Sequence, residues 1–267
     1  TVGASPRGVG GRMADALAAR GLRTALYSME GTQTWMRGFN TNPEFIHKRR
    51  GSVVLHDHAA LQDVIVNITR TRHQNVYAEE YTTGLRDAIA SSEKLKGFLD
   101  NAELRTSWTT GTGLDQQLHQ VAKMIATRGA RKAERDFFFV QLGGFDTHNE
   151  VLDTMSELFS TLNRALAQFV AEMEAQGAFQ DVALMSLSDF GRTLASNGRG
   201  TDHGWAGNHF VLGGSVNGGR VYNDFPSSLS LGSEQDFGRG RLVPKYPWEN
   251  MVVPMAEWMG VEADHMA

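Results

Sequence analysis

FFFVQLGGFDTH, residues 137–148, begins with an unbroken apolar run of the kind that a strand buried on both faces needs. Residues 150–176 follow with apolar side chains at helical spacing on one stripe, and Gly177 is suited to end that helix. Two more apolar runs, VALMSL (182–187) and HFVLGG (209–214), predict further strands. We therefore expect an α/β fold, a three-layer αβα sandwich. Residues 137–142, 182–187 and 210–212 should be neighbouring central strands, with the long helix over one face.

Polar side chains gather where these predicted strands end. Asp146 and His148 follow the first strand, and Asp189 follows the second. Asp202 and His203 lie in the loop that leads to the third. Parallel strands bring their carboxyl ends to one edge of a sheet, so these residues should converge there. Carboxylates and neutral imidazoles are ligands for a divalent metal such as zinc or manganese. Each residue alone is more typical of an ordinary loop, but the set favours a site.

Three motifs, GGFDTH (143–148), SDFGRT (188–193) and TDHG (201–204), resemble those of the bacterial domain-of-unknown-function 1501 family. The resemblance continues through 209–226 and 239–261, and more weakly through 8–17. That family is distantly similar to the alkaline phosphatase and sulfatase superfamily. The resemblance implies one alkaline phosphatase/sulfatase-like domain over residues 1–267. It also suggests a periplasmic or secreted protein.

The resemblance assigns roles by motif order. Asp146 and His148 match the superfamily's earlier metal-binding pair, and Asp189 and His203 match its later Asp and final His. The expected metal ligands are therefore Asp146, His148, Asp189 and His203. Hydrolysis of a small anionic ester, a phosphate or a sulfate, would be the reaction. Arg192 is the candidate catalytic residue, because a guanidinium can hold an oxyanion by two hydrogen bonds; a salt bridge to Asp189 or Asp202 is the alternative role.

Two departures from the superfamily pattern weaken the hydrolase interpretation. Relatives carry a glycine-rich strand end with an Asp near the N-terminus, followed by a nucleophile, and nothing of that kind precedes Gly8. The N-terminal strand region is therefore expected to be missing from this sequence, unless the chain never had it and residues 24–28 take its place. The superfamily's adjacent Asp-His is also replaced by Asp189-Phe190. A complete two-metal site cannot be assembled from these residues.

Composition narrows the alternatives. With 26 Lys+Arg against 30 Asp+Glu and no basic block, nucleic acid is not an expected partner. No apolar stretch is long enough to predict a membrane span. The chain has no Cys, which excludes disulfides, thiolate metal sites and the Cys-derived formylglycine of typical sulfatases. The competing interpretation is a catalytically inactive structural or assembly protein on the same scaffold, binding a protein partner or a second copy of itself.

The remaining segments predict a strand and several helices. We expect a strand at 24–28, helices at 12–20, from 57 or 58 to 68, 76–99, 114–128 and 249–259, and a hairpin at 217–219 that returns in a strand at 220–222. Pro254 should kink or interrupt the last helix. His56 and His58 flank Asp57 and could form a metal pair, although surface positions are favoured.

Overall fold

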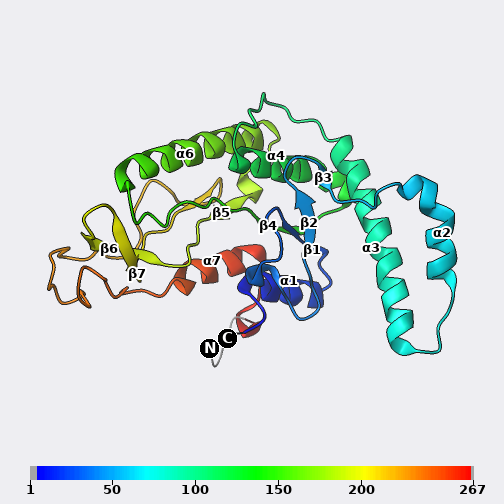
Figure 1. Ribbon diagram of the computed structural model, residues 1–267, viewed down its shortest axis with the longest axis horizontal. Coiled ribbons are helices and arrows are strands. Elements are labelled where there is room, and N and C mark those ends of the chain that lie inside the picture. Colours follow the sequence, from blue (N-terminus) through cyan, green and yellow to red (C-terminus); the bar gives the residue numbers. More distant parts are fainter. Residues whose placement is uncertain (1–4, 266–267) are drawn as a thin grey trace. The chain divides into compact units, whose positions relative to one another are not determined.

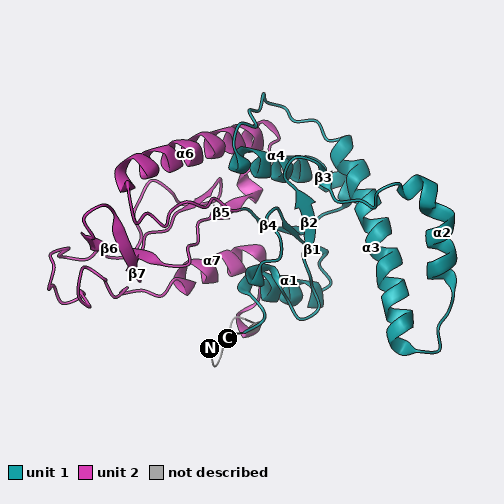
Figure 2. Cartoon of the chain, viewed as in Figure 1, with its two compact units in different colours: residues 1–140 teal, residues 141–267 magenta. Residues whose placement is uncertain are grey.

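The computed structural model describes residues 5–265 and divides the chain into two compact units, Thr1–Val140 and Gln141–Ala267 (Figure 2). Helices and several separate sheets make up both units, so the fold is mixed α/β, as predicted. No helix within the described part of the chain has the length and apolarity to cross a membrane.

The first unit is built on a four-stranded sheet with the order β3-β2-β1-β4 (Figure 1). Its strands are β1 (Thr24–Ser28), β2 (Glu44–His47), β3 (Gly51–Ser52) and β4 (Arg135–Phe139). Strand β1 pairs in parallel with both β2 and β4, whereas β2 and β3 are antiparallel. Strand β1 therefore has a hydrogen-bonded partner on each side and lies in the interior of the sheet.

Helices supply most of the core of the first unit. They are α1 (Val9–Ala19), α2 (His58–Arg70), α3 (Val76–Asp100), α4 (Gly113–Ala126) and α5 (Arg128–Arg131), with a 3-10 turn at Thr34–Met36. A capping box starts α4, in which Thr112 and Asp115 bond each other's backbone N–H groups. Fully buried apolar side chains come from α1, α3, α4, the 3-10 turn and β2: Leu17, Met36, Ile46, Leu99, Leu118 and Met124.

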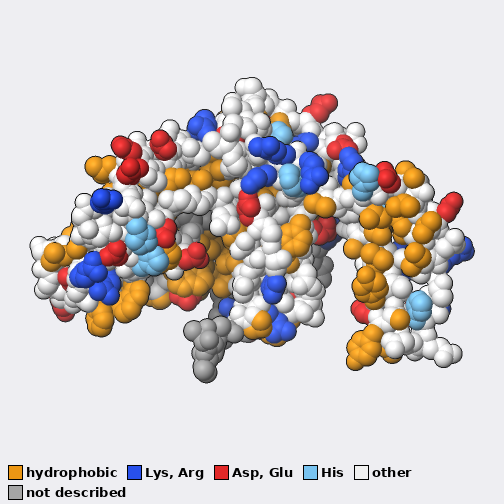
Figure 3. Space-filling view, in the orientation of Figure 1, with side chains coloured by type: hydrophobic (Ala, Val, Ile, Leu, Met, Phe, Trp, Pro, Cys, Tyr) orange, Lys and Arg blue, Asp and Glu red, His pale blue; other side chains and the backbone are white. Residues whose placement is uncertain are grey.

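Helices α2 and α3 pack against each other but leave much apolar surface exposed (Figure 3). Helix α2, which is described throughout, buries only Thr69. Tyr77 and Tyr81 near the start of α3 keep 87% and 71% of their surface exposed. Helix α2 and the first half of α3 therefore contribute little to the core of the unit, whereas Leu95 and Leu99 near the end of α3 are buried in it.

The second unit contains one long helix and two small antiparallel sheets. Helix α6 (Val151–Ala175) has its C-cap at Gln176, and Gly177 then turns the chain with a φ of +65°, a left-handed conformation that glycine adopts without strain. Strand β5 (Ala183–Met185) pairs with β8 (Val211–Gly213), and β6 (Gly191–Ser196) pairs with β7 (Thr201–Gly204). The other elements are 3-10 turns at Phe179–Asp181 and Ala263–His265 and helix α7 (Glu249–Met259).

The predicted sheet of three neighbouring strands is wrong. Strand β4 belongs to the sheet of the first unit, while β5 and β8 pair with each other. Moreover, β5 and β8 are antiparallel, so no parallel edge gathers their ends. An apolar run predicts a buried strand but not its partner, and β1 satisfies the edge of β4 instead.

Three smaller predictions are also corrected. Residues 188–204 were expected to be loop, but Gly191–Ser196 and Thr201–Gly204 within this stretch form the β6–β7 hairpin. Residues 220–222 form no returning strand. Helix α7 continues through Pro254, so the predicted interruption does not occur, although proline has no N–H to donate to the Asn250 carbonyl one turn earlier. The predicted helices at 58–68, 76–99 and 249–259 are confirmed.

Candidate functional site

The first part of the site is the loop between β4 and α6. Phe145 makes an edge-to-face contact with Phe159 of α6, with ring centroids 6.1 Å apart, and Thr147 is buried. Their neighbours Asp146 and His148 remain exposed. The alternation of anchored and exposed residues therefore presents a carboxylate and an imidazole from a loop that its apolar neighbours hold in place.

The second part is the β6–β7 hairpin, in which Arg192 and His203 are directly opposite each other. Glycines allow its close contacts. A Cβ at Gly191 would lie 1.9 Å from the carbonyl oxygen of Ala206, and one at Gly200 would lie 2.4 Å from the carbonyl carbon of His148. The Thr201 N–H donates to the Thr147 oxygen at 3.1 Å, which joins the hairpin to the loop.

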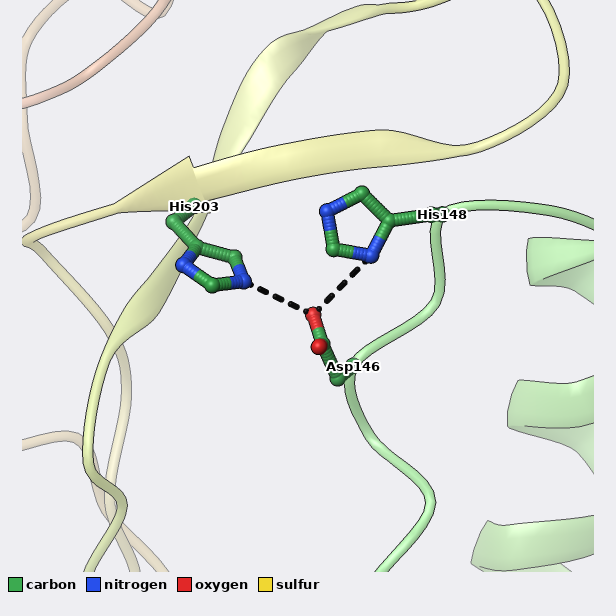
Figure 4. A group of neighbouring side chains, drawn as sticks. All are labelled: Asp146, His148 and His203. Carbon is green, nitrogen blue, oxygen red and sulfur yellow. Dashed lines mark hydrogen bonds and ion pairs between the residues drawn. The ribbon is translucent and has the colours of Figure 1, made fainter.

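Asp146, His148 and His203, hereafter the ligand cluster, converge where the loop and the hairpin meet (Figure 4). His203 Nε2 lies 3.0 Å from Asp146 Oδ1, and His148 Nδ1 lies 3.2 Å from the same oxygen. One ligand atom from each residue falls within 4.8 Å of the others. All three side chains are about half exposed, at 53%, 45% and 55% for Asp146, His148 and His203.

Arg192 connects Asp146, in the loop before α6, to the β6–β7 hairpin. Its Nη1 donates to Asp146 Oδ1, its Nε donates to Thr201 Oγ1 at 3.0 Å, and its Nη2 donates to the Thr201 carbonyl. These contacts use three of the five N–H groups of a guanidinium. The salt bridge considered from the sequence is thus formed, but to Asp146 rather than to Asp189 or Asp202.

The carboxyl of Asp146 is held in its ionised form. Partial desolvation raises the pKa of Asp146, but hydrogen bonds from Arg192 and His203 and the charge of His148 lower it by more. Its pKa therefore lies below the ordinary value of 3.8. An ionised carboxylate beside two imidazoles is the state that a divalent cation binds.

Phe190 lies beside the ligand cluster, against His203. Its ring stacks on His203 with the centroids 4.0 Å apart and the planes at 19°. The Arg192 guanidinium carbon lies 5.8 Å from the centroid of the same ring. Phe190 therefore offers no ligand atom, but it limits the orientations open to the His203 imidazole.

Asp189 lies outside the ligand cluster. Its side chain is exposed in the loop before β6. His56 and His58 do not form a pair either, because His56 contacts Asp57 at 2.9 Å and His58 contacts Glu93 at 3.4 Å. The structure thus brings together three of the four predicted ligands and adds the predicted arginine.

The sequence interpretation missed the residues that surround the cluster. Asn197 Nδ2 donates to the His148 carbonyl at 3.3 Å and to Asp202 Oδ1 at 3.1 Å. Arg239 Nη2 lies 2.5 Å from Asp202 Oδ2. These bonds, that of Asn197 first, lower the pKa of Asp202. Asn197-Gly198 is a turn signal that could have indicated the hairpin, whereas nothing in the sequence connects Arg239 with position 202.

Comparison with known protein families now identifies the chain. The family described as Protein of unknown function (DUF1501) matches residues 33–237. The chain belongs to the DUF1501 family. The matched segment contains the whole ligand cluster, Arg192 and the β6–β7 hairpin. No curated protein and no solved structure matches this DUF1501 chain. The family resemblance inferred from the sequence is thus confirmed, and the family description assigns no activity.

Proposed function

We propose that this DUF1501 protein is a metal-dependent hydrolase of phosphate or sulfate esters, related to the alkaline phosphatase and sulfatase superfamily. The observation that carries the proposal is the ligand cluster. Three ligand atoms from two separate segments lie within 4.8 Å of one another on exposed side chains. Such an arrangement is open to a substrate, which a purely structural metal site would not require.

The donor set fits a divalent ion. One carboxylate oxygen and two imidazole nitrogens are typical zinc ligands, and three protein ligands leave a position open in a catalytic zinc site. Asp146, His148 and His203 would hold the ion. A bound ion would polarise the ester oxygen and lower the pKa of a bound water molecule.

Arg192 is suited to bind the anionic group of the substrate. It is fixed by Asp146 and by two acceptors on Thr201, and its side chain is 21% exposed. Two of its five N–H groups have no acceptor among the described residues and can bind two oxygens of a phosphoryl or sulfuryl group. Lysine cannot reproduce this planar arrangement.

A hydrolysis assay tests this function. Protein supplied with zinc or manganese should release nitrophenol from 4-nitrophenyl phosphate or 4-nitrophenyl sulfate. His203→Gln should lose this activity by removing a ligand, and Arg192→Lys should lose at least about tenfold, because one oxyanion-binding donor is typically worth more than that. His56→Gln, at a side chain that is 93% exposed, is the matched control and should retain wild-type activity.

A non-enzymatic structural role is the second candidate, and the bonds of Arg192 favour it. Asp146, Arg192 and Thr201 form a network that joins the loop before α6 to the β6–β7 hairpin. A hydrogen-bond network of this kind can serve to hold two loops in place without binding any ligand. In that case the wild-type protein would bind no metal and hydrolyse neither ester, while Arg192→Lys would still lower stability.

A further inference from the structure

The two histidines of the ligand cluster come from different segments, so their spacing depends on how the β6–β7 hairpin is attached to the loop before α6. His148 belongs to the loop and His203 to β7. Their ring centroids lie 5.2 Å apart. A metal ion accepts little variation in the distances to its ligands. The contacts that attach the hairpin to the loop should therefore affect affinity for the ion.

Asn197, in the turn between β6 and β7, makes four side-chain hydrogen bonds across this junction. Its Oδ1 accepts from the backbone N–H groups of Arg199 at 3.0 Å and Gly200 at 2.8 Å. Its Nδ2 donates to the His148 carbonyl at 3.3 Å and to Asp202 Oδ1 at 3.1 Å. A side-chain amide has two acceptor positions and two donor hydrogens, and here all four are used.

The four bonds divide into two functions. The two that Oδ1 accepts shape the turn, as Asn commonly does by bonding its own backbone two or three residues ahead. The two that Nδ2 donates leave the turn, and one of them reaches the backbone of His148 itself. Asn197 is thus connected at one end to the hairpin that carries His203 and at the other end to a proposed ligand.

The packing around Gly200 supports the same attachment. The Thr201 N–H donates to the Thr147 oxygen at 3.1 Å, next to the Asn197 bond to His148. A Cβ at position 200 would lie 2.5 Å from that same Thr147 oxygen. The turn therefore approaches the loop as closely as backbone atoms allow, and a displaced turn could not keep both bonds.

We propose that Asn197 is a positioning residue of the metal site, which holds His148 at the distance from His203 that binding of a divalent cation requires. The inference rests on the proposed metal binding at the ligand cluster. The proposed role belongs to Asn197 Nδ2, which donates to the His148 carbonyl. The bonds that Oδ1 accepts shape the turn and are of a kind found in hairpins generally. Groups that orient metal ligands in this way typically contribute 10–100-fold to metal affinity.

Asn197→Ala and Asn197→Asp separate the two ends of the amide in a zinc titration against a chelating dye. Asp retains the acceptors for the Arg199 and Gly200 N–H groups but has no N–H to donate. Both variants should bind zinc about 10–100-fold more weakly than wild type. Asp also places a second carboxylate beside Asp202 Oδ1 and the His148 carbonyl. Weaker binding must therefore appear in Asn197→Ala too, which removes the donors without adding a charge. Arg199→Ala, which changes a neighbouring side chain and keeps the backbone N–H, is the control and should bind as wild type does.

Hydrogen exchange of the Thr201 amide in metal-free protein provides a second measurement. Exchange should be faster in both Asn197 variants than in wild type and Arg199→Ala, because the bond to Thr147 opens more often. Wild-type zinc affinity in both Asn197 variants would overturn the inference, as would weakened binding in Asn197→Ala alone. If the wild-type protein binds no zinc, the proposed metal site itself fails, and faster Thr201 exchange would then show Asn197 as a loop connector only.

Discussion

Two arginine–aspartate pairs, one in each unit, show how burial separates a structural ion pair from one that can serve a ligand. Arg131 and Asp136 in the first unit keep only 6% and 12% of their side chains exposed. Arg192 and Asp146 in the second keep 21% and 53%. The first pair is surrounded by protein, with Tyr27 Oη 3.1 Å from Arg131 Nη1. The second shares its carboxylate with two exposed imidazoles.

The contacts of the buried Arg131–Asp136 pair are with other protein groups. Arg131 Nη2 lies 2.5 Å from Asp136 Oδ2 and also donates to the Met124 carbonyl at 2.8 Å, so α4, α5 and β4 are joined through one guanidinium. Asp146 Oδ1, by contrast, receives several donors at once from neighbours that solvent can reach. The same two residue types are therefore enclosed by protein in one unit and accessible to a ligand, as the proposed function requires, in the other.

The largest expected effect is a loss of protein stability when the buried Arg131–Asp136 pair is broken. Arg131→Ala leaves Asp136 as an uncompensated buried charge and should cost about 3–5 kcal/mol of unfolding free energy. Urea denaturation followed by circular dichroism measures this loss. Arg50→Ala, at an exposed position, should change stability by less than about 0.5 kcal/mol. An Arg131 variant as stable as that control would remove the contrast between the two pairs.

A substitution in the exposed Arg192–Asp146 pair should change metal affinity rather than stability. Asp146→Asn keeps the shape of the side chain but removes the charge, so zinc affinity should fall by more than about 100-fold, the upper range for groups that merely orient ligands. Isothermal titration with zinc measures it. Asp136→Asn should leave zinc affinity unchanged while lowering stability. If both variants lost zinc equally, the loss would reflect unfolding rather than a removed ligand.

Protein stability should depend on alkaline pH through Tyr27, which contacts the buried pair at Arg131. Burial raises the pKa of Tyr27 to about 12, from an ordinary value of 10.0, although the Arg131 charge opposes the shift. The neutral phenol is therefore favoured in the folded state. Its contribution is complete below pH 10 and is lost as the pH rises from 10 to about 12, by roughly 1.4 kcal/mol per unit. Tyr27→Phe should abolish this alkaline dependence in denaturation curves, and an unchanged dependence would assign it to another group.

The smallest effect is expected from acid at the exposed pair. Because the pKa of Asp146 is lowered below 3.8, its ionised form stabilises the folded state above that pH, and the contribution disappears as the pH falls through the folded-state pKa. Asp146→Asn should therefore flatten acid denaturation curves of metal-free protein below about pH 4. Identical acid curves for variant and wild type would mean that the carboxylate contributes nothing without metal.

The sequence predicted individual elements far better than their pairing. Helices α3 and α7 and strand β1 were expected within a residue of their bounds, because helical stripes and short apolar runs are local signals. The partner of β4 was not predictable in this way. Its FFF run is equally compatible with β1 or with a strand later in the chain, since hydrogen-bonding edges carry no sequence code.

Three of the predicted ligands lie together, but not for the reason expected from the sequence. Asp146, His148 and His203 do converge, although the parallel sheet edge expected to gather them does not form. They converge because the β6–β7 hairpin carries His203 and Arg192 back to the loop before α6. Asp189 precedes that hairpin and stays outside the cluster. The contacts of Asn197 and Arg239 depend on tertiary packing, which no local pattern reports.

The metal content of the purified wild-type protein tests the central claim most directly. Protein incubated with zinc, passed through a desalting column and measured by inductively coupled plasma mass spectrometry should retain about one equivalent per chain, as a single site of three protein ligands predicts. Asp146→Asn should retain almost none under the same treatment. A wild-type protein that retains no more zinc than Asp146→Asn would contradict the account, and the ligand cluster would then be only a network that orders two loops.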